Sequence, residues 1–132
     1  MKNLFTFILG ITLSLSTLVC SAQSLEAQAE IQTKEMAQKL DLNEGNYLKL
    51  KNINLNRLHR IAALAKLREQ DHRYLDLRLD AIEEEYSAAV YKILKPSQFS
   101  AFMNYRQEQP YTYAGVTNDM NRTKTIAIQT EE

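Results

Sequence analysis

A repeating pattern of apolar residues in the second half of the chain constrains its fold more than any other feature. The pattern runs through Leu75, Leu79, Ile82, Tyr86, Ala89 and Ile93, at alternating spacings of four and three residues. That spacing places the apolar side chains on one face of an α-helix, as in a helix that packs lengthwise against another. The 132 residues include only three glycines and two prolines, fewer than the turns of a β-rich fold need. An all-α fold is therefore predicted.

A second long helix is predicted over residues 44–68, before the one at 72–94. It contains six cations and no anion between Lys49 and Arg68, and its apolar side chains form two stripes around most of its circumference. One stripe can pack against residues 72–94, which gives a long antiparallel hairpin. The other stripe is expected to need a second subunit or a bound client. A single helix of about 50 residues is the alternative, since no Gly or Pro forces a reversal.

Shorter helices are predicted on both sides of the hairpin. Residues 23–40 are rich in Ala, Glu, Gln and Lys, which favour helices, and Asn43 can cap the helix that follows. Pro96 suits the first turn of another helix, and Gln98 can reach back to its start as in a capping box. Beyond Pro110 the apolar pattern dissolves into Thr, Asn and Gln, so residues 110–132 are predicted to be a disordered tail.

The N-terminus has the features of an export signal. Lys2 supplies a positive charge, residues 4–19 form an apolar run, and residues 20–22 form a small-residue cleavage site, so residues 1–22 are predicted to be a cleaved signal peptide. The run is shorter than the roughly 20 residues of a spanning helix, and a bulky residue before Cys20 disfavours a lipoprotein. The expected mature domain, residues 23–109, is periplasmic, without stable membrane insertion, and without cysteine.

Two of the predicted helix starts resemble the LTxxQ motifs of the Spy/CpxP family of bacterial periplasmic proteins. Residues 94–98 (LKPSQ), followed by residues 99–106, are similar to the second motif, and residues 40–46 (LDLNEGN) are similar to a degraded first motif. Asn43 and Lys95 stand where the family has Thr, and Asn46 stands for the first Gln. By position, the resemblance over residues 36–106 implies five structural motif residues: Leu42, Asn43, Leu94, Pro96 and Gln98.

The resemblance implies a cradle-shaped antiparallel homodimer of all-α chains. Some members of the family are ATP-independent chaperones that hold unfolded proteins on a concave, basic and apolar face; others modulate an envelope-stress sensor, and some relatives bind zinc or other metals. We therefore expect a chaperone-like protein whose partners are unfolded or misfolded envelope proteins. The alternative is a regulatory module that docks on the sensor domain of an envelope-stress kinase. A metal-responsive sensor of the zinc type is a third possibility.

A client-binding face is predicted on the basic helix. Apolar side chains there would hold exposed hydrophobic segments, and interleaved cations would attract acidic chains. One alternative is that the cations pair with acids of residues 72–94; another is a helix that lies on a membrane surface. The predicted client-binding residues share one arc of the helix: Lys49, Leu50, Ile53, Arg57, Arg60, Leu64, Leu67 and Arg68.

The sequence carries no pattern typical of an enzyme. It has no Gly-rich phosphate loop and no HExxH spacing, and no cysteine remains after cleavage, so neither catalysis nor a cofactor is expected. Export also argues against nucleic acid as a partner. The two histidines, His59 and His72, do not share one site on a straight helix, and a closed metal site needs about three or four ligands. No metal ligand is therefore assigned.

Overall fold

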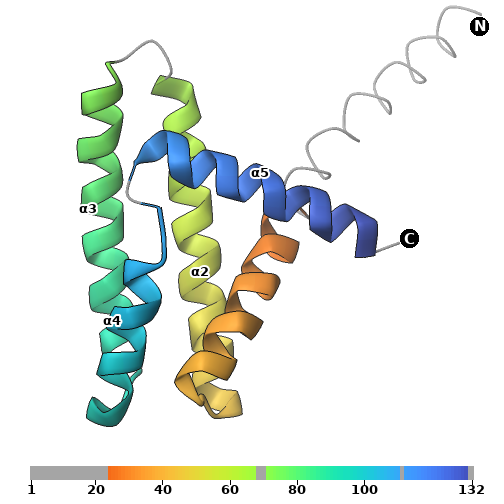
Figure 1. Ribbon diagram of the computed structural model, residues 1–132, viewed down its shortest axis with the longest axis vertical. Coiled ribbons are helices and arrows are strands. Elements are labelled where there is room, and N and C mark those ends of the chain that lie inside the picture. Colours follow the sequence, from red (N-terminus) through yellow and green to blue (C-terminus); the bar gives the residue numbers. More distant parts are fainter. Residues whose placement is uncertain (1–23, 68–70, 111, 131–132) are drawn as a thin grey trace, which may run out of the picture.

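The structure is helical wherever it has regular secondary structure in the part of the chain that it describes (Figure 1). This computed structural model describes residues 24–67, 71–110 and 112–130. The predicted all-α fold is confirmed, whereas the predicted signal peptide and Arg68 lie outside the described residues. The elements are an N-terminal helix over residues 24–40, α2 (Glu44–Leu64), the 3-10 turn η1 (Ala65–Leu67), α3 (His72–Tyr91), the 3-10 turn η2 (Pro96–Gln98), α4 (Phe99–Gln107) and α5 (Tyr113–Thr130).

The two longest helices, α2 and α3, form the predicted antiparallel hairpin (Figure 1). Asn46 bonds to Ile93 near one end of the pair, and Arg57 bonds to Glu83 farther along. Residue numbers rise along α2 while they fall along α3, which defines the antiparallel order. The single long helix considered as an alternative is therefore excluded. We call the end of the hairpin near residues 67 and 71 its tip, and the opposite end its base.

The buried face of α3 follows the predicted pattern in its first half and shifts in its second. Leu75, Leu79, Ile82 and Tyr86 are buried as predicted, but Val90 and Leu94 are buried next, where Ala89 and Ile93 were expected. An α-helix has 3.6 residues per turn, so a straight helix drifts by about 20° per heptad away from a strict seven-residue repeat. The drift brings Val90 into the core in place of Ala89. Leu94 lies beyond the end of α3 at Tyr91, so the turn after the helix determines its burial.

The second apolar stripe of α2 is covered within the same chain only in its middle, where Leu58 is buried and Leu55 is half-buried, so the expectation that the stripe needs a second subunit or a client remains a prediction. The N-terminal helix packs antiparallel to α2 and brings Ala29 beside Leu58 and Leu40 beside Leu50. Leu50 and Leu58 are both fully buried. Leu48, at the start of the stripe, remains 57% exposed. Ala62 and Ala65, at the other end of the stripe, are exposed as well.

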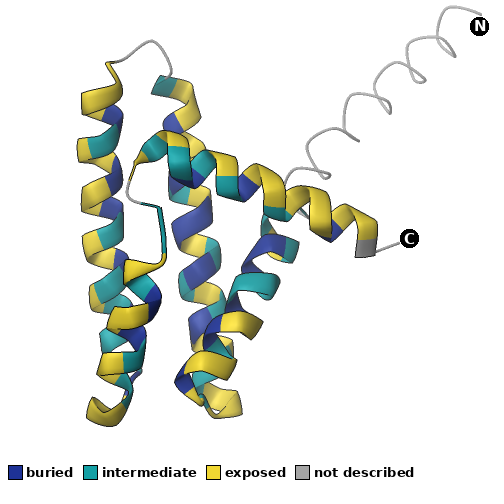
Figure 2. Cartoon of the chain, viewed as in Figure 1, coloured by how far each residue is buried: buried dark blue, intermediate teal, exposed yellow. Residues whose placement is uncertain are grey.

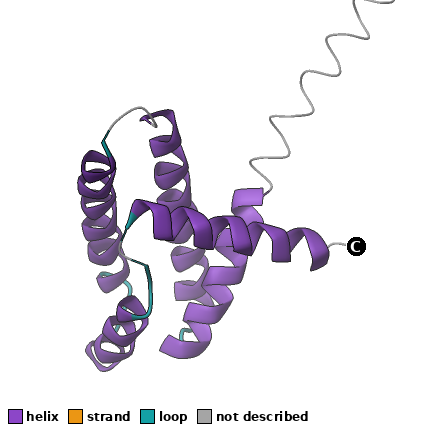
Figure 3. Ribbon diagram, turned by 45° about the horizontal axis from the view of Figure 1, so that its top comes forward, coloured by secondary structure: helices purple, strands orange, loops and turns teal. Residues whose placement is uncertain are grey.

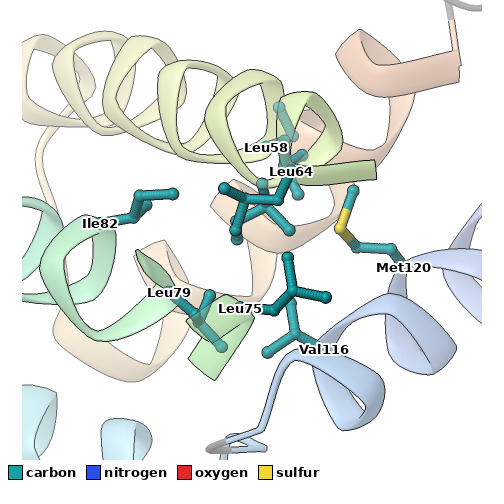
Figure 4. Packing of buried hydrophobic residues seen from close by; sticks show 9 residues of the cluster. Leu58, Leu64, Leu75, Leu79, Ile82, Val116 and Met120 are labelled. Atoms are coloured by element: carbon teal, nitrogen blue, oxygen red, sulfur yellow. The ribbon is translucent and has the colours of Figure 1, made fainter. Parts of the chain in front are cut away.

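The core divides into two clusters along the hairpin. Figure 2 shows that buried and exposed positions alternate along the helices. The tip cluster joins the N-terminal helix, α2, α3 and α5 (Figure 4). The base cluster joins the N-terminal helix, α2, α3, the segment after α3, and α4. The tip cluster consists of Ala29, Leu58, Ile61, Leu64, Leu75, Leu79, Ile82, Val116 and Met120, and the base cluster of Met36, Leu40, Leu50, Tyr86, Val90, Leu94, Phe102 and Tyr105.

The helix α5 corrects the prediction of a disordered tail over residues 110–132. Residues Tyr113–Thr130 are helical and run across the hairpin near its tip (Figures 1 and 3). Val116 and Met120 lie one helical turn apart, and both are buried in the tip cluster. Contacts with distant residues stabilise this helix in spite of a composition that does not favour one.

None of the helices in the described ranges combines the length and apolar character needed to cross a bilayer.

Candidate functional site: a groove between α2 and α3

One face of the hairpin carries two adjoining depressions, which we call the α2–α3 groove. The depression nearer the base has a volume of about 310 Å³, and the one nearer the tip about 510 Å³. Arg60, Ile82 and Glu85 line both, so the two are continuous. All lining residues belong to α2, η1 or α3. Besides the shared three, they are Asn52, Ile53, Asn56, Arg57, Tyr86 and Ala89 near the base, and Ala63, Leu64, Lys66, Leu67, Arg78 and Ala81 near the tip.

The tip half of the groove is basic and has an apolar lining. Leu64 and Ile82 lie in this half beside the small side chains of Ala63 and Ala81. Neither Lys66 nor Arg78, which line the same half, has an ion-pair partner among the residues that the structure describes. This half of the groove therefore offers apolar contact together with uncompensated positive charge.

Arg60, in the middle of the groove, is paired across the hairpin. Its Nη1 atom lies 2.6 Å from Glu85 Oε2. This hydrogen bond raises the pKa of the Arg60 guanidinium and lowers the pKa of the Glu85 carboxyl. Both side chains are exposed to solvent, so the pair contributes little to stability and either side chain can exchange it for another partner.

Arg57 lines the groove, but its guanidinium group belongs to a largely buried ion-pair network. Its Nε and Nη2 atoms lie 2.8 and 2.6 Å from Glu83 Oε1, and Arg106 of α4 lies 2.7 Å from Glu83 Oε2. Both guanidinium groups also lie over the ring of Tyr86, at 5.1 and 5.6 Å from its centroid. Burial opposes the charge of Arg57, but the Glu83 carboxylate more than offsets this and raises the pKa of Arg57. The Arg57 side chain is therefore buried in an ion pair with Glu83 and is not available to a partner in the groove.

A second buried polar chain continues from Tyr86 into the N-terminal helix. The Tyr86 hydroxyl donates to Asn54 Oδ1 (2.9 Å), and Asn54 Nδ2 donates to Thr33 Oγ1 (2.9 Å). Burial raises the pKa of the Tyr86 phenol, which keeps it a hydrogen-bond donor. Sequence reasoning missed Asn54 and Thr33. The signal available was an amide side chain placed one turn from both Leu50 and Leu58, within an apolar stripe.

The predicted client-binding residues are distributed unevenly over this structure. Ile53, Arg57, Arg60, Leu64 and Leu67 line the groove.

The remaining predicted residues do not line it. Leu50 is fully buried in the base cluster, which corrects its assignment to a client-binding surface. Lys49 is exposed outside the groove, and Arg68 lies outside the described residues. The alternative that cations pair with acids of α3 is confirmed for Arg57 and Arg60. The sequence pattern had not included Arg78, Ala81 or Ala89, because these residues come from the opposite helix.

The two motif-like segments meet at the base of the hairpin. Gln98 Oε1 accepts from the backbone N–H of Lys95 (2.8 Å), as the capping-box pattern predicts. Gln98 Nε2 donates across to the carbonyl oxygens of Leu40 (2.7 Å) and Asp41 (3.1 Å). In the opposite direction, Asn46 Nδ2 donates to the carbonyl oxygen of Ile93 (2.8 Å). A side chain of each segment therefore donates to backbone carbonyl oxygens at the end of the helix that precedes the other segment, where those oxygens have no partner within their own helix.

Local capping explains where these segments begin. Asn43 Oδ1 accepts from the N–H of Asn46 (2.9 Å), which confirms Asn43 as the cap of α2. Asp41 has a φ of +49°, a left-handed conformation that ends the N-terminal helix, and the N–H of Leu42 returns to the Ala37 carbonyl (3.1 Å). Pro96 starts η2, as predicted. Leu42 packs against the base cluster and Leu94 belongs to it.

The described residues contain no group of three His, Cys, Asp or Glu side chains placed to hold a metal ion. His59 and His72 are both exposed.

Comparison with known protein families, characterised proteins and solved structures finds no match for this chain.

Proposed function

We propose that this chain is an ATP-independent, chaperone-like periplasmic protein that binds segments of unfolded or misfolded envelope proteins in the α2–α3 groove. The observation that carries the proposal is the tip half of that groove. It combines an apolar lining with the cations Lys66 and Arg78, which have no ion-pair partner among the described residues. Exposed surfaces of this kind attract chains that display both apolar and acidic side chains.

Binding in the groove requires no bond to be made or broken. Apolar client side chains would contact the exposed Ala63 and Ala81 and the half-buried Leu67 in the groove, and client carboxylates would approach Lys66 and Arg78. The Arg60–Glu85 pair is solvent-exposed and weak, so its arginine can turn to a client carboxylate at small cost. Many such weak contacts give fast and reversible adsorption, which suits a holding function.

We further propose that two chains associate as an antiparallel homodimer, which would place two grooves on one assembly. Two weak sites on one particle raise the effective concentration of the second contact and strengthen binding to a long client. Light scattering at tens of micromolar protein should then give twice the mass of one chain. A strict monomer under those conditions would contradict the cradle arrangement but leave binding in each groove testable.

The deciding experiment is suppression of client aggregation by purified residues 23–132 without nucleotide. An unfolded client is diluted into buffer with the native protein or with the Lys66→Ala/Arg78→Ala variant over a salt series. The matched control is Lys49→Ala/Lys124→Ala, which removes two exposed cations that do not line the groove. We expect the native protein and the control to keep the client soluble, and the groove variant to do so several-fold less well at low salt.

The other outcomes separate the rival functions. Equal loss in both variants would mean that net charge, and not the groove, attracts the client. If the folded native protein does not suppress aggregation at all, the chaperone proposal fails. A single saturable partner would then favour the regulatory module that docks on a sensor domain, and calorimetry with zinc would test the metal-responsive alternative.

A further inference from the structure

The helix α5 covers an apolar surface that α2 and α3 would otherwise expose near the hairpin tip. Val116 and Met120 of α5 are 3% and 9% exposed. They complete the tip cluster, to which α2 contributes Leu58 and Ile61 and α3 contributes Leu75 and Leu79 (Figure 4). The two α5 side chains lie one turn apart, as in an amphipathic helix that is bound in a groove. The surface beneath α5 therefore binds a helix through two apolar side chains one turn apart, and a helix from another chain with the same two side chains could bind it in the same way.

The contact between α5 and the tip cluster lies in the first half of this 18-residue helix, where Val116 and Met120 belong to the cluster and Tyr113 packs against it. A depression of about 460 Å³ separates part of α2, at Ala62 and Ala65, from α5, at Thr117 and Asn121. Farther along, Ala127 is buried, whereas Ile128 is 55% exposed. A hydrogen bond from the backbone N–H of Tyr113 to Asp76 Oδ1 (2.8 Å) holds the first turn. Few apolar contacts and much exposed surface are the physical basis of a low free energy of local opening.

The composition of α5 adds little helix stability of its own. Its 18 residues include Gly115, two Asn and four Thr, all of them weaker helix formers than Ala or Leu. The hydroxyls of Thr117, Thr123 and Thr125 bond back to carbonyl oxygens of their own helix, an arrangement that slightly destabilises it. Once undocked, this segment would lose most of its helical structure, because tertiary packing supplies most of the stability of such a helix.

We propose that α5 is an autoinhibitory cover. It occupies an apolar surface of α2 and α3 which, once α5 is displaced, takes the apolar face of a helical segment from a client chain. The partner segment is one that presents two apolar side chains four residues apart, as α5 does with Val116 and Met120. The proposal rests on the proposed function for the identity of the partner, whereas the opening of α5 stands independently of it.

The opening of α5 is tested by residue-resolved hydrogen exchange on the full chain under native conditions. Backbone amides of α5 should exchange at least ten-fold faster than the buried amides of α2 and α3, because α5 opens while the hairpin stays folded. Exchange of α5 and the hairpin at the same rate, in one cooperative step, would overturn the proposal. This measurement needs no substitution, so it decides the question even if a variant fails to fold.

The exposed surface is tested with a pair of matched variants of the full chain. Val116→Asp/Met120→Asp places two carboxylates in the buried contact, and Ile128→Asp/Gln129→Asp places two at exposed positions of the same helix. We expect the first to increase the fluorescence of an apolar dye several-fold and to bind a labelled synthetic peptide of residues 112–130. The second should behave like the native chain. Circular dichroism checks that the other helices remain.

The results distinguish this proposal from the proposed function. If the Val116→Asp/Met120→Asp variant keeps its hairpin but binds neither dye nor peptide better than the control, the covered-surface proposal is wrong. If it binds the peptide while the Lys66→Ala/Arg78→Ala variant has normal chaperone activity, the groove fails and the surface under α5 remains. Peptide binding by the native chain at a rate limited by α5 opening supports the cover directly.

Discussion

At the scale of single residues, Glu83 joins two arginines that come from different helices. Arg57 of α2 and Arg106 of α4 each form an ion pair with one carboxylate oxygen, and all three side chains are at most 20% exposed. Neighbouring Glu84 is exposed on the same helix and has no comparable pairing. The sequence presents Glu83 and Glu84 as equivalent members of an acidic run, and only their surroundings distinguish them.

Glu83→Gln should lower the free energy of unfolding by about 3 kcal/mol, because it leaves two largely buried guanidinium groups without a countercharge. Glu84→Gln is the matched control and should change it by less than about 0.5 kcal/mol. Urea denaturation monitored by circular dichroism at pH 7 measures both. Equal effects in the two variants would show that the network contributes nothing specific to stability.

The burial of Tyr105 leads to a prediction of how the free energy of unfolding changes at high pH. Burial, with a smaller effect of the nearby Glu35 carboxylate, raises the pKa of Tyr105 from 10.0 to about 12. Because the pKa is raised in the folded state, the neutral Tyr105 phenol stabilises the fold fully below pH 10, and this stabilisation is lost as the pH rises towards 12. Between pH 10 and 12, the free energy of unfolding of Tyr105→Phe should therefore fall less than that of the native chain. The difference should reach about 2–3 kcal/mol once the native tyrosine is fully ionised.

Urea midpoints at a series of pH values test the Tyr105 prediction. The structure records no hydrogen bond of the Tyr105 hydroxyl among the described residues, so the variant should match the native chain at pH 7. If the two curves fall in parallel above pH 10, another group carries the pH dependence.

At the scale of elements, the ends of the helices were predicted better than their packing. Asn43 and Gln98 make the capping interactions expected from their positions, because a cap depends on residues two or three positions away. The contacts of Gln98 with Leu40 and Asp41 span more than 50 residues. No local pattern predicts them.

Gln98→Ala should therefore cost more than the loss of a local cap. It removes one acceptor for the Lys95 N–H and one donor for the carbonyl oxygens at the end of the N-terminal helix, which gives an expected loss of about 1–2 kcal/mol. Ser97→Ala changes an exposed neighbour and should be close to neutral. Thermal denaturation of both variants measures the difference, and a neutral Gln98→Ala would mean that the two motif-like segments are held by packing alone.

At the scale of the whole molecule, three other helices of the chain cover apolar faces of α2 and α3. The N-terminal helix and α4 cover the base, and α5 covers the tip on one side. The α2–α3 groove is a face of the hairpin that no other described helix lines. Both proposals concern these faces: the open groove binds clients directly, and the covered surface becomes available when α5 opens.

The all-α class, the hairpin and most helix boundaries follow from the sequence, because periodicity, capping and the scarcity of Gly and Pro act over a few residues. The tertiary structure decided which residues those helices bury. Arg57 is an interior residue because Glu83 and Arg106 converge on it from two other helices. Residues Tyr113–Thr130 are helical because Val116 and Met120 reach the tip cluster. Burial and charge pairing depend on residues that are distant in the chain, so a linear pattern places an amphipathic face without showing what covers it.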